Sequence, residues 1–162
     1  MTLDLVAKKA VLRSFSYGLF AVAAAYEGER GIFTANWISQ VSFDPPMVAL
    51  SVELDSSTLP LIRRSGLFSV SPLRAGQREL AGDLGRPKRR AGDKVAALGD
   101  QIVQTMSGTI AFAGGLGFCV CQVVSETAAG DSVLFIGEVI EAVAGEAGEP
   151  LTMKEAGFRH SG

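Results

Sequence analysis

Short apolar runs, each closed by a cluster of turn-forming residues, constrain the fold of this chain more than any other feature. The clearest runs span residues 19–26, 32–42, 47–54, 67–70, 118–124 and 133–143. The Gly-containing segment 27–31 joins the first two runs, and Asp44-Pro45-Pro46 ends the second, because proline cannot donate to a strand ladder. Strands joined by tight turns pair antiparallel, so the sequence predicts a mainly β fold, an antiparallel β-barrel with a few helices.

Three short segments have the pattern of helices. Apolar residues recur at helical spacing over residues 4–15, and residues 77–84 predict a second helix. Residues 59–65 follow Ser56-Ser57-Thr58, whose hydroxyl groups are typical of a helix N-cap. The segment 74–94 is rich in Lys, Arg, Gly and Pro, which favours an excursion over the protein surface.

Composition and charge exclude several classes of protein. Hydrophobic residues make up 48% of the 162 residues and charged residues 20%, which is enough apolar material for one folded domain spanning residues 1–162. The formal net charge of −2 lacks the basic excess of a nucleic-acid binder, so we expect no nucleic acid as a partner. Two cysteines cannot form a disulfide framework, and one histidine cannot form a His-rich metal site, so no metal is expected.

Two segments resemble targeting or membrane-spanning sequences. Basic residues precede the apolar residues 14–25, which fits either a secretory signal or an amphipathic helix followed by a buried strand; Asp4 and Gly18 favour the second. Residues 101–125 carry no charge but contain several glutamines, threonines and glycines, so they predict buried strands rather than a membrane span. We therefore expect a cytoplasmic protein that crosses no membrane, a location that also fits two unpaired cysteines.

Small and hydrogen-bonding side chains crowd residues 34–42, just before the double proline. This pattern fits either the solvated face of an edge strand or a surface of backbone and amide groups that binds a flat polar heterocycle. The hydroxyl groups at 56–58 likewise fit either a plain N-cap or an anion site at a helix start. No nucleophile or acid–base constellation is recognisable, so the catalytic residues stay unassigned.

The segment from Gly31 to Val52 carries the motifs Thr-Ala-Asn-Trp and Ser-Phe-Asp-Pro-Pro. It resembles the flavin reductase-like, FMN-binding split β-barrel family, and in particular its flavoredoxin-like branch. Weaker matching blocks follow in the expected order, among them Phe68-Ser69-Val70, residues 134–139 and Pro150-Leu151-Thr152-Met153. The resemblance thus covers most of the chain.

The resemblance implies a homodimer of split barrels, each binding one FMN near the subunit interface. The residues that it would place along the flavin ring and ribityl chain are Thr34, Ala35, Asn36, Trp37, Ser39 and Gln40. Ser56, Ser57 and Thr58 would hold the phosphate, which agrees with the anion site inferred from the residues themselves.

The function implied is that of a flavin reductase, which passes reducing equivalents from NADH or NADPH to FMN and on to an acceptor. One departure bears on the donor, because Ser132 stands where many relatives have a histidine associated with the nicotinamide. His160 could substitute, although it lies two residues from the end, where chains fray. The alternative function is a non-enzymatic FMN electron carrier reduced by a redox partner protein. Ser132 and the flavoredoxin-like form of the motif favour it, and the basic residues 86–90 offer a docking surface for an acidic donor.

Overall fold

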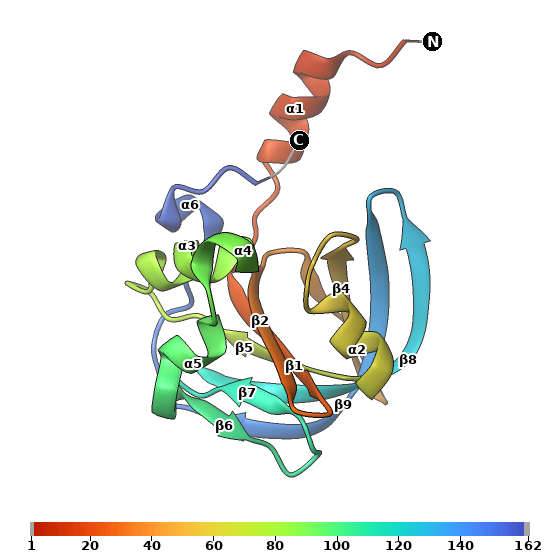
Figure 1. The fold of residues 1–162 in the computed structure, drawn as a ribbon. Coiled ribbons are helices and arrows are strands. Elements are labelled where there is room, and N and C mark those ends of the chain that lie inside the picture. Colours follow the sequence, from red (N-terminus) through yellow and green to blue (C-terminus); the bar gives the residue numbers. More distant parts are fainter. Residues whose placement is uncertain (1, 161–162) are drawn as a thin grey trace.

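The computed structural model describes residues 2–160, which form a mainly antiparallel β structure (Figure 1). The strands are β1 (Phe20–Tyr26), β2 (Glu29–Ala35), β3 (Ile38–Phe43), β4 (Pro46–Glu53), β5 (Leu67–Pro72), β6 (Ile102–Gln104), β7 (Ile110–Phe112), β8 (Gly117–Ala129) and β9 (Ser132–Ala144). The helices are α1 (Leu5–Arg13), α2 (Leu59–Ser65), α3 (Arg78–Gly85), α4 (Lys88–Ala91), α5 (Lys94–Leu98) and α6 (Met153–Ala156), with a 3₁₀ turn at Gly99–Gln101. The predicted mainly β class is confirmed.

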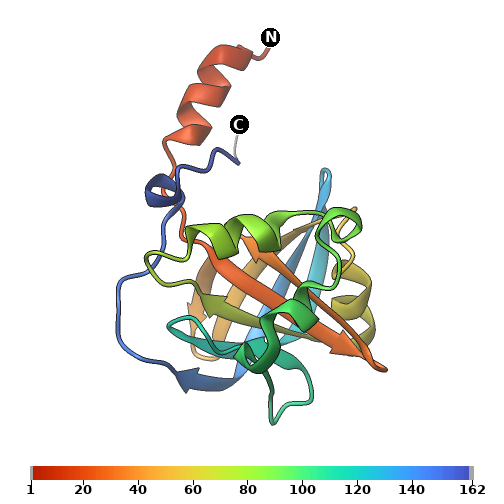
Figure 2. The same cartoon turned by 60° about the vertical axis from the view of Figure 1, so that its left-hand side comes forward.

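Seven strands form one sheet in the order β2-β1-β5-β8-β9-β4-β3, and β6 pairs with β7 alone. The large sheet curls around its own core, as Figures 1 and 2 show. Within residues 2–160 its edge strands β2 and β3 share no ladder, so the barrel stays open between them. This opening is the split of the split barrel, and it positions the site described below.

The predicted strand over residues 32–42 is wrong in one respect, because the structure divides it into β2 and β3 at Asn36-Trp37. β2 pairs with β1 at one edge of the sheet, whereas β3 pairs with β4 at the other. The chain must therefore cross the opening between the two edges, and Asn36 and Trp37 make that crossing. No glycine or proline marks the break in the sequence.

β1 explains why the sequence shows continuous apolar runs instead of alternation. Ala21 and Ala23 pack into one core cluster with α3, α5 and β7, while Val22 and Ala24 pack into the barrel interior with α2. Successive side chains of a strand point to opposite faces, and here both faces are buried. The run 19–26 therefore reads as an unbroken apolar strand, as predicted.

The predicted helices at 59–65 and 77–84 are confirmed as α2 and α3, and the predicted helix at 4–15 as α1. α1 projects away from the barrel (Figures 1 and 2), and none of its residues is buried. The predicted surface excursion at 74–94 is wrong in part, because Ala81 and Leu84 of α3 are buried against the sheet. None of the helices among residues 2–160 is long and apolar enough to span a membrane.

Candidate functional site

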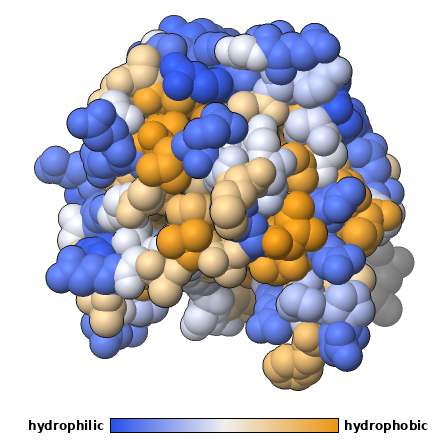
Figure 3. Space-filling view, turned by 90° about the horizontal axis from the view of Figure 1, so that it is seen from below, coloured by the Kyte–Doolittle hydropathy of each residue, from blue (hydrophilic) through white to orange (hydrophobic). Residues whose placement is uncertain are grey.

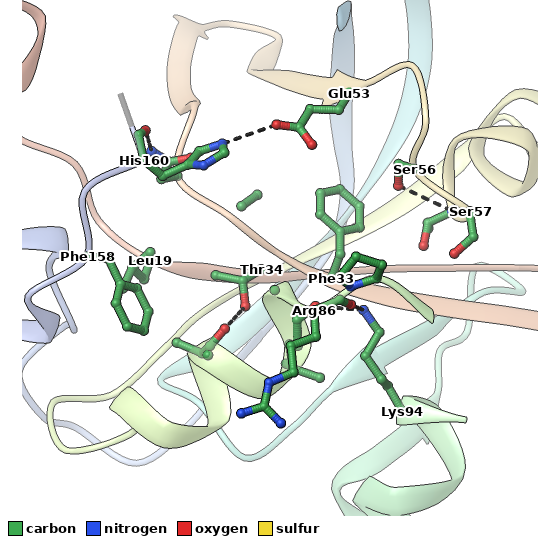
Figure 4. Close-up of a pocket in the computed structure, with 18 of the residues that line it drawn as sticks. Leu19, Phe33, Thr34, Glu53, Ser56, Ser57, Arg86, Lys94, Phe158 and His160 are labelled. Carbon is green, nitrogen blue, oxygen red and sulfur yellow. Dashed lines mark hydrogen bonds and ion pairs between the residues drawn. The ribbon is translucent and has the colours of Figure 1, made fainter. Parts of the chain in front are cut away.

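A cavity of about 750 Å³ opens where the barrel is split (Figure 4). Its lining comes from the β2–β3 crossing, the loop between β4 and α2, the segment from α3 to α5, and the C-terminal segment. The lining includes Phe33, Thr34, Ala35, Asn36, Trp37, Glu53, Ser56, Ser57, Thr58, Arg86, Lys88, Arg89, Lys94, Met153, Phe158 and His160. Its volume lies within the range of small-molecule and cofactor sites, roughly 300–1,000 Å³.

The crossing at the end of β2 forms one wall of this cavity. Thr34, Ala35, Asn36 and Trp37 all line it, as the sequence predicted for a ligand wall. The Thr34 hydroxyl donates to the Ala81 carbonyl at 2.6 Å, which ties β2 to α3. The hydroxyl proton is used in that bond, so toward a ligand the Thr34 side chain can act only as a hydrogen-bond acceptor.

Ser39 and Gln40 lie elsewhere. They line a second, shallower hollow with Phe20, Ile38 and Phe118, on the strand β3 beyond the crossing. The Ser39 hydroxyl donates to the Gln40 carbonyl, and the Gln40 amide donates to the Ser42 carbonyl. The structure therefore does not bring these two residues to the main cavity, because β3 turns away to the other edge of the sheet.

The loop before α2 places three hydroxyl residues at the cavity, but they have different surroundings. Thr58 is only 1% exposed and occupies the N-cap position without a side-chain cap bond. The Ser56 hydroxyl accepts a hydrogen bond from the Thr58 amide at 3.3 Å. Ser57 is exposed at the cavity edge. A bound anion would thus meet Ser57 and Ser56 first, with Thr58 packed beneath them.

Close packing of β2 against this loop depends on Gly31. A Cβ at Gly31 would lie 2.6 Å from the Thr58 hydroxyl oxygen and 3.2 Å from a methyl group of Leu61. A glycine in an extended strand costs backbone entropy, so its presence here is explained by this approach. Without a side chain at residue 31, the loop of residues 56–58 can pack directly against β2, which forms the wall of the cavity.

Three basic side chains, Arg86, Lys88 and Arg89, line the cavity from the α3–α4 segment and are called the cationic rim. They line the same cavity as the loop of residues 56–58, called the hydroxyl loop. Lys94 is half-buried, and its ammonium group donates to the carbonyls of Leu84 at 2.6 Å and Arg86 at 3.1 Å. Burial lowers the pKa of Lys94 from its usual range, because a charged group loses solvation there. Lys94, which follows the rim residues in the chain, therefore ties this part of the chain back to Leu84 and Arg86.

The C-terminal segment closes the opposite side. Phe158 and His160 both line the cavity, and the His160 ring lies 5.8 Å from the ring of Trp37. The His160 Nε2 atom lies 3.2 Å from a carboxylate oxygen of Glu53, and the Asn36 amide donates to the His160 carbonyl at 3.3 Å. The expectation that His160 frays is wrong, because these contacts hold it at the cavity.

Ser132 does not reach this cavity. It is the first residue of β9, is buried, and donates from its hydroxyl to the Asp131 carboxylate at 3.0 Å. Its strand partner across the sheet is Glu53, the residue that His160 contacts. Among residues 2–160 no group of three or more His, Cys, Asp or Glu side chains could hold a metal ion, and Cys119 and Cys121 are unpaired.

The sequence profile described as "Flavin reductase like domain" matches residues 12–162. The chain belongs to this family. The reductase component of 4-hydroxyphenylacetate 3-monooxygenase from Thermus thermophilus is 34% identical over 153 residues, or 93% of each chain. An NADH-dependent FAD reductase from Streptomyces globisporus is 30% identical over 156 residues, or 96% of this chain and 85% of the relative. A solved NADH:FAD oxidoreductase from Streptomyces globisporus, 27% identical, superposes with a TM-score of 0.79 over 94% of this chain and 92% of that one.

This flavin reductase is therefore an enzyme of the oxidoreductase class, and the predicted family and activity are confirmed. Sequence reasoning missed the cationic rim, Glu53 and Phe158. In the sequence the rim residues indicate only a docking surface, and they carry no local signal for a pocket. Their position follows from the packing of α3 on the sheet, which no short motif in the sequence encodes.

Proposed function

We propose that this flavin reductase binds FMN in the main cavity, takes a hydride from NADH or NADPH, and supplies reduced flavin to a separate oxygenase. The observation that carries the proposal is the division of one cavity into two chemically different ends. In Figure 4 Ser57 and Lys94 lie on one side of the cavity, and Phe158 and His160 lie on the other, where the Trp37 ring is next to His160. A flavin mononucleotide has the same division, with a phosphate at one end and a flat ring at the other.

The residues at the phosphate end fit an anion. Arg86, Lys88 and Arg89 supply positive charge, and Ser56 and Ser57 supply hydroxyl donors. Glu53 and Asp55 are the acidic side chains of the cavity. In Figure 4 Glu53 lies next to His160 and away from Arg86 and Lys94. Asp55 directly precedes Ser56, so the proposed phosphate end holds this one carboxylate against Arg86, Lys88 and Arg89, and positive charge is still in excess there.

The wall at residues 34–37 fits the flat ring. Ala35 is small and nearly buried, which lets a planar group approach the backbone of β2. Phe33, Phe158 and Met153 add apolar surface to the same cavity. Bound FMN would supply a ring that accepts a hydride from a dihydronicotinamide and releases the electrons to an acceptor. The chain orients that ring, excludes water from it and neutralises the phosphate.

We further propose that two copies of this single-domain chain associate as a homodimer. Support comes from apolar side chains that no other part of residues 2–160 covers, including Phe43 at 92% and Val41 at 53% exposure on the edge strand β3. Figure 3 shows apolar patches interrupting the polar surface on the face seen from below. Exposed apolar surface of this kind is typical of association sites. Light scattering of the wild type and of Phe43→Asp tests the proposal, with a monomeric wild type as the contrary result.

The partner oxygenase is proposed from the relatives alone, since the Thermus protein and a Rhodococcus opacus relative are named as reductase components of monooxygenases. The acceptor would then be a second protein that receives reduced flavin. A cytoplasmic location is part of the same proposal and is supported by two unpaired cysteines. The electron-carrier alternative loses its docking surface in part, because Arg86, Lys88 and Arg89 line the cavity; Ser132 in place of the family histidine still favours it.

The decisive experiment is anaerobic. Purified protein is mixed with FMN, FAD or riboflavin, NADH or NADPH is added, and the visible flavin band is followed. We expect the flavin band to bleach far faster than in protein-free flavin. The rate with FMN should exceed the rate with riboflavin, because riboflavin lacks the phosphate. A perturbed flavin spectrum without bleaching by either nucleotide would refute the reductase and point to a carrier fed by a protein donor.

A further inference from the structure

We propose that Cys119 and Cys121 of β8 form a two-thiolate site for a soft monovalent cation of the cuprous class. The chain has two cysteines, and both are free thiols. Cys119 lines the second hollow, of about 340 Å³, and does not line the main cavity. The site is therefore separate from the proposed flavin chemistry.

Both cysteine side chains point into the barrel interior. On the β5 side the ladder is regular, with Cys119 opposite Val70 and Cys121 opposite Phe68. On the β9 side the register shifts next to Cys121, but the extra residue is Ile140 of β9, so β8 keeps its own alternation. Residues two apart on a regular strand project from the same face. Accordingly, Cys121 belongs to the interior cluster, and Cys119 packs against that cluster.

The two thiol groups contact each other at the hollow. The Cys121 thiol donates a hydrogen bond to the Cys119 sulfur, which lowers the pKa of Cys119 from its usual range. Cys119 is partly exposed, whereas Cys121 is fully buried. β9 presents no side chain to Cys121, because a Cβ at Gly137 would lie 2.8 Å from the Cys121 Cβ. One sulfur is thus reached from the hollow, and the other is held beside it in the interior.

The spacing of the two residues favours a bridging cation over a disulfide. Alternate residues of a strand are about 6.6–6.8 Å apart, and their side chains project in parallel. A disulfide needs Cβ atoms about 3.5–4.5 Å apart, which parallel side chains at this spacing do not provide. A cation bonded to two sulfurs at about 2.3 Å each separates them by about 4.6 Å in a linear arrangement. Each sulfur then leans about 1 Å toward the other, and the strand need not move.

The ligand set decides which cation fits. A structural zinc ion takes four ligands, and calcium and magnesium take oxygen ligands. In the part of the chain that the structure describes, no third Cys, His, Asp or Glu side chain joins the pair in a metal-binding group. The site therefore requires a cation that is satisfied by two soft sulfur ligands. Soft thiolates select the cuprous ion among the common transition metals.

Binding exchanges protons for the cation. Two S–H bonds break, two sulfur–metal bonds form, and two protons leave to solvent. No electron is transferred, so the step needs neither an oxidant nor a reductant. The bound site carries one negative charge, which is less than two separate thiolates would carry.

Anaerobic competition with bicinchoninate, a chromogenic Cu(I) chelator, measures the affinity. We expect the wild type to take one Cu(I) per chain from the chelator. Cys119→Ala and Cys121→Ala should each lose more than about 100-fold in affinity, since even changes outside the ligand set cost about 10–100-fold. Val123→Ala is the matched control and should equal the wild type. It lies on the same strand and packs against the same cluster, and it keeps both thiols.

Two further readouts separate a built site from two reactive thiols. The unfolded chain carries the same cysteines, so Cu(I) raises Tm only when the folded site binds it more tightly. We expect Tm to rise with Cu(I) in the wild type and in Val123→Ala, and to stay unchanged in Cys119→Ala. X-ray absorption of the Cu(I)-loaded wild type should show two sulfur neighbours in a linear arrangement.

Each contrary result overturns the proposal. Cu(I) that stays with the chelator shows that the wild type has no such site, and an unchanged affinity in Cys119→Ala shows that the ligands lie elsewhere. A Tm that Cu(I) leaves unchanged or lowers in the wild type shows adventitious thiol binding only. Three or more neighbours around Cu(I) mean that a group outside the pair, such as a thiol of a second copy, completes the site. None of these results bears on flavin reduction, so the proposed function would stand.

Discussion

Replacing Gly31 with alanine tests whether the hydroxyl loop and the β2 wall must approach as closely as the structure shows. Gly31 has an ordinary backbone conformation, so alanine introduces no strain in φ. The new Cβ would lie 2.6 Å from the Thr58 hydroxyl oxygen and 3.2 Å from the Thr58 Cβ. Because Thr58 is fully buried, its hydroxyl has no open space to enter, and the loop itself must move.

The expected cost follows from overpacking. An added methyl group in a well-packed core costs about 1–3 kcal/mol. In a chain of this length each kcal/mol lowers Tm by about 2–4 °C, so Tm should fall by about 2–12 °C. Displacement of Thr58 also moves the Ser56 hydroxyl that accepts from its amide. We therefore expect weaker FMN binding, with riboflavin binding less affected because riboflavin has no phosphate.

Thermal unfolding and flavin titration measure both effects. Gly82→Ala is the control for stability, because its Cβ would meet only Phe158 at an ordinary 3.7 Å and alanine favours the helix. The double variant Gly31→Ala/Thr58→Ala removes the clashing oxygen and should recover part of the lost stability relative to additivity. An unchanged Tm in Gly31→Ala, or a double variant that is simply additive, would refute the packing argument.

Three further substitutions probe the cavity, and one probes the core. Lys94→Met removes the two hydrogen bonds to the carbonyls of Leu84 and Arg86. The KM for FMN should rise about fivefold, a change in binding free energy of about one net hydrogen bond, because the cationic rim loses its support. An unchanged KM would contradict the role of Lys94. Ser57→Ala should raise the Kd for FMN several-fold and leave riboflavin unchanged, whereas equal losses would remove the anion site. Ser132→His should leave the KM for the nicotinamide nucleotide unchanged, because residue 132 is buried and does not line the cavity; a lower KM would show that a side chain at this position reaches the donor. Ser71→Ala should leave Tm unchanged or raise it, because the Ser71 hydroxyl is buried without a partner among residues 2–160; a fall of several degrees would reveal a bond.

Local features of the sequence were sufficient to predict most strands and helices. The run at 19–26 predicted β1 because both faces of that strand are buried, so every position is apolar. The runs at 118–124 and 133–143 predicted β8 and β9, although β8 continues beyond its run to Ala129. The division at Asn36-Trp37 could not be predicted, because it arises from the distance between two sheet edges and not from the residues at the break.

The same contrast holds for the site. Ser56, Ser57 and the wall residues from Thr34 to Trp37 were predicted because they occur in two short, recognisable segments. Ser39 and Gln40 belong to the same segment in sequence, yet β3 carries them to another hollow. A continuous motif therefore predicted the residues before the crossing correctly and failed for those after it.

The basic segment at 86–90 shows how placement changes an interpretation. In the sequence its charges suit a docking surface for an acidic redox partner, which favours a carrier. In the fold the Lys94 ammonium group donates to the carbonyls of Leu84 and Arg86. The side chains of Arg86, Lys88 and Arg89 line the cavity. A positive charge that neutralises a bound phosphate is unavailable to a partner protein while the flavin is held. The same residues that offered a docking surface in the sequence thus support, in the structure, a site that binds FMN by its phosphate.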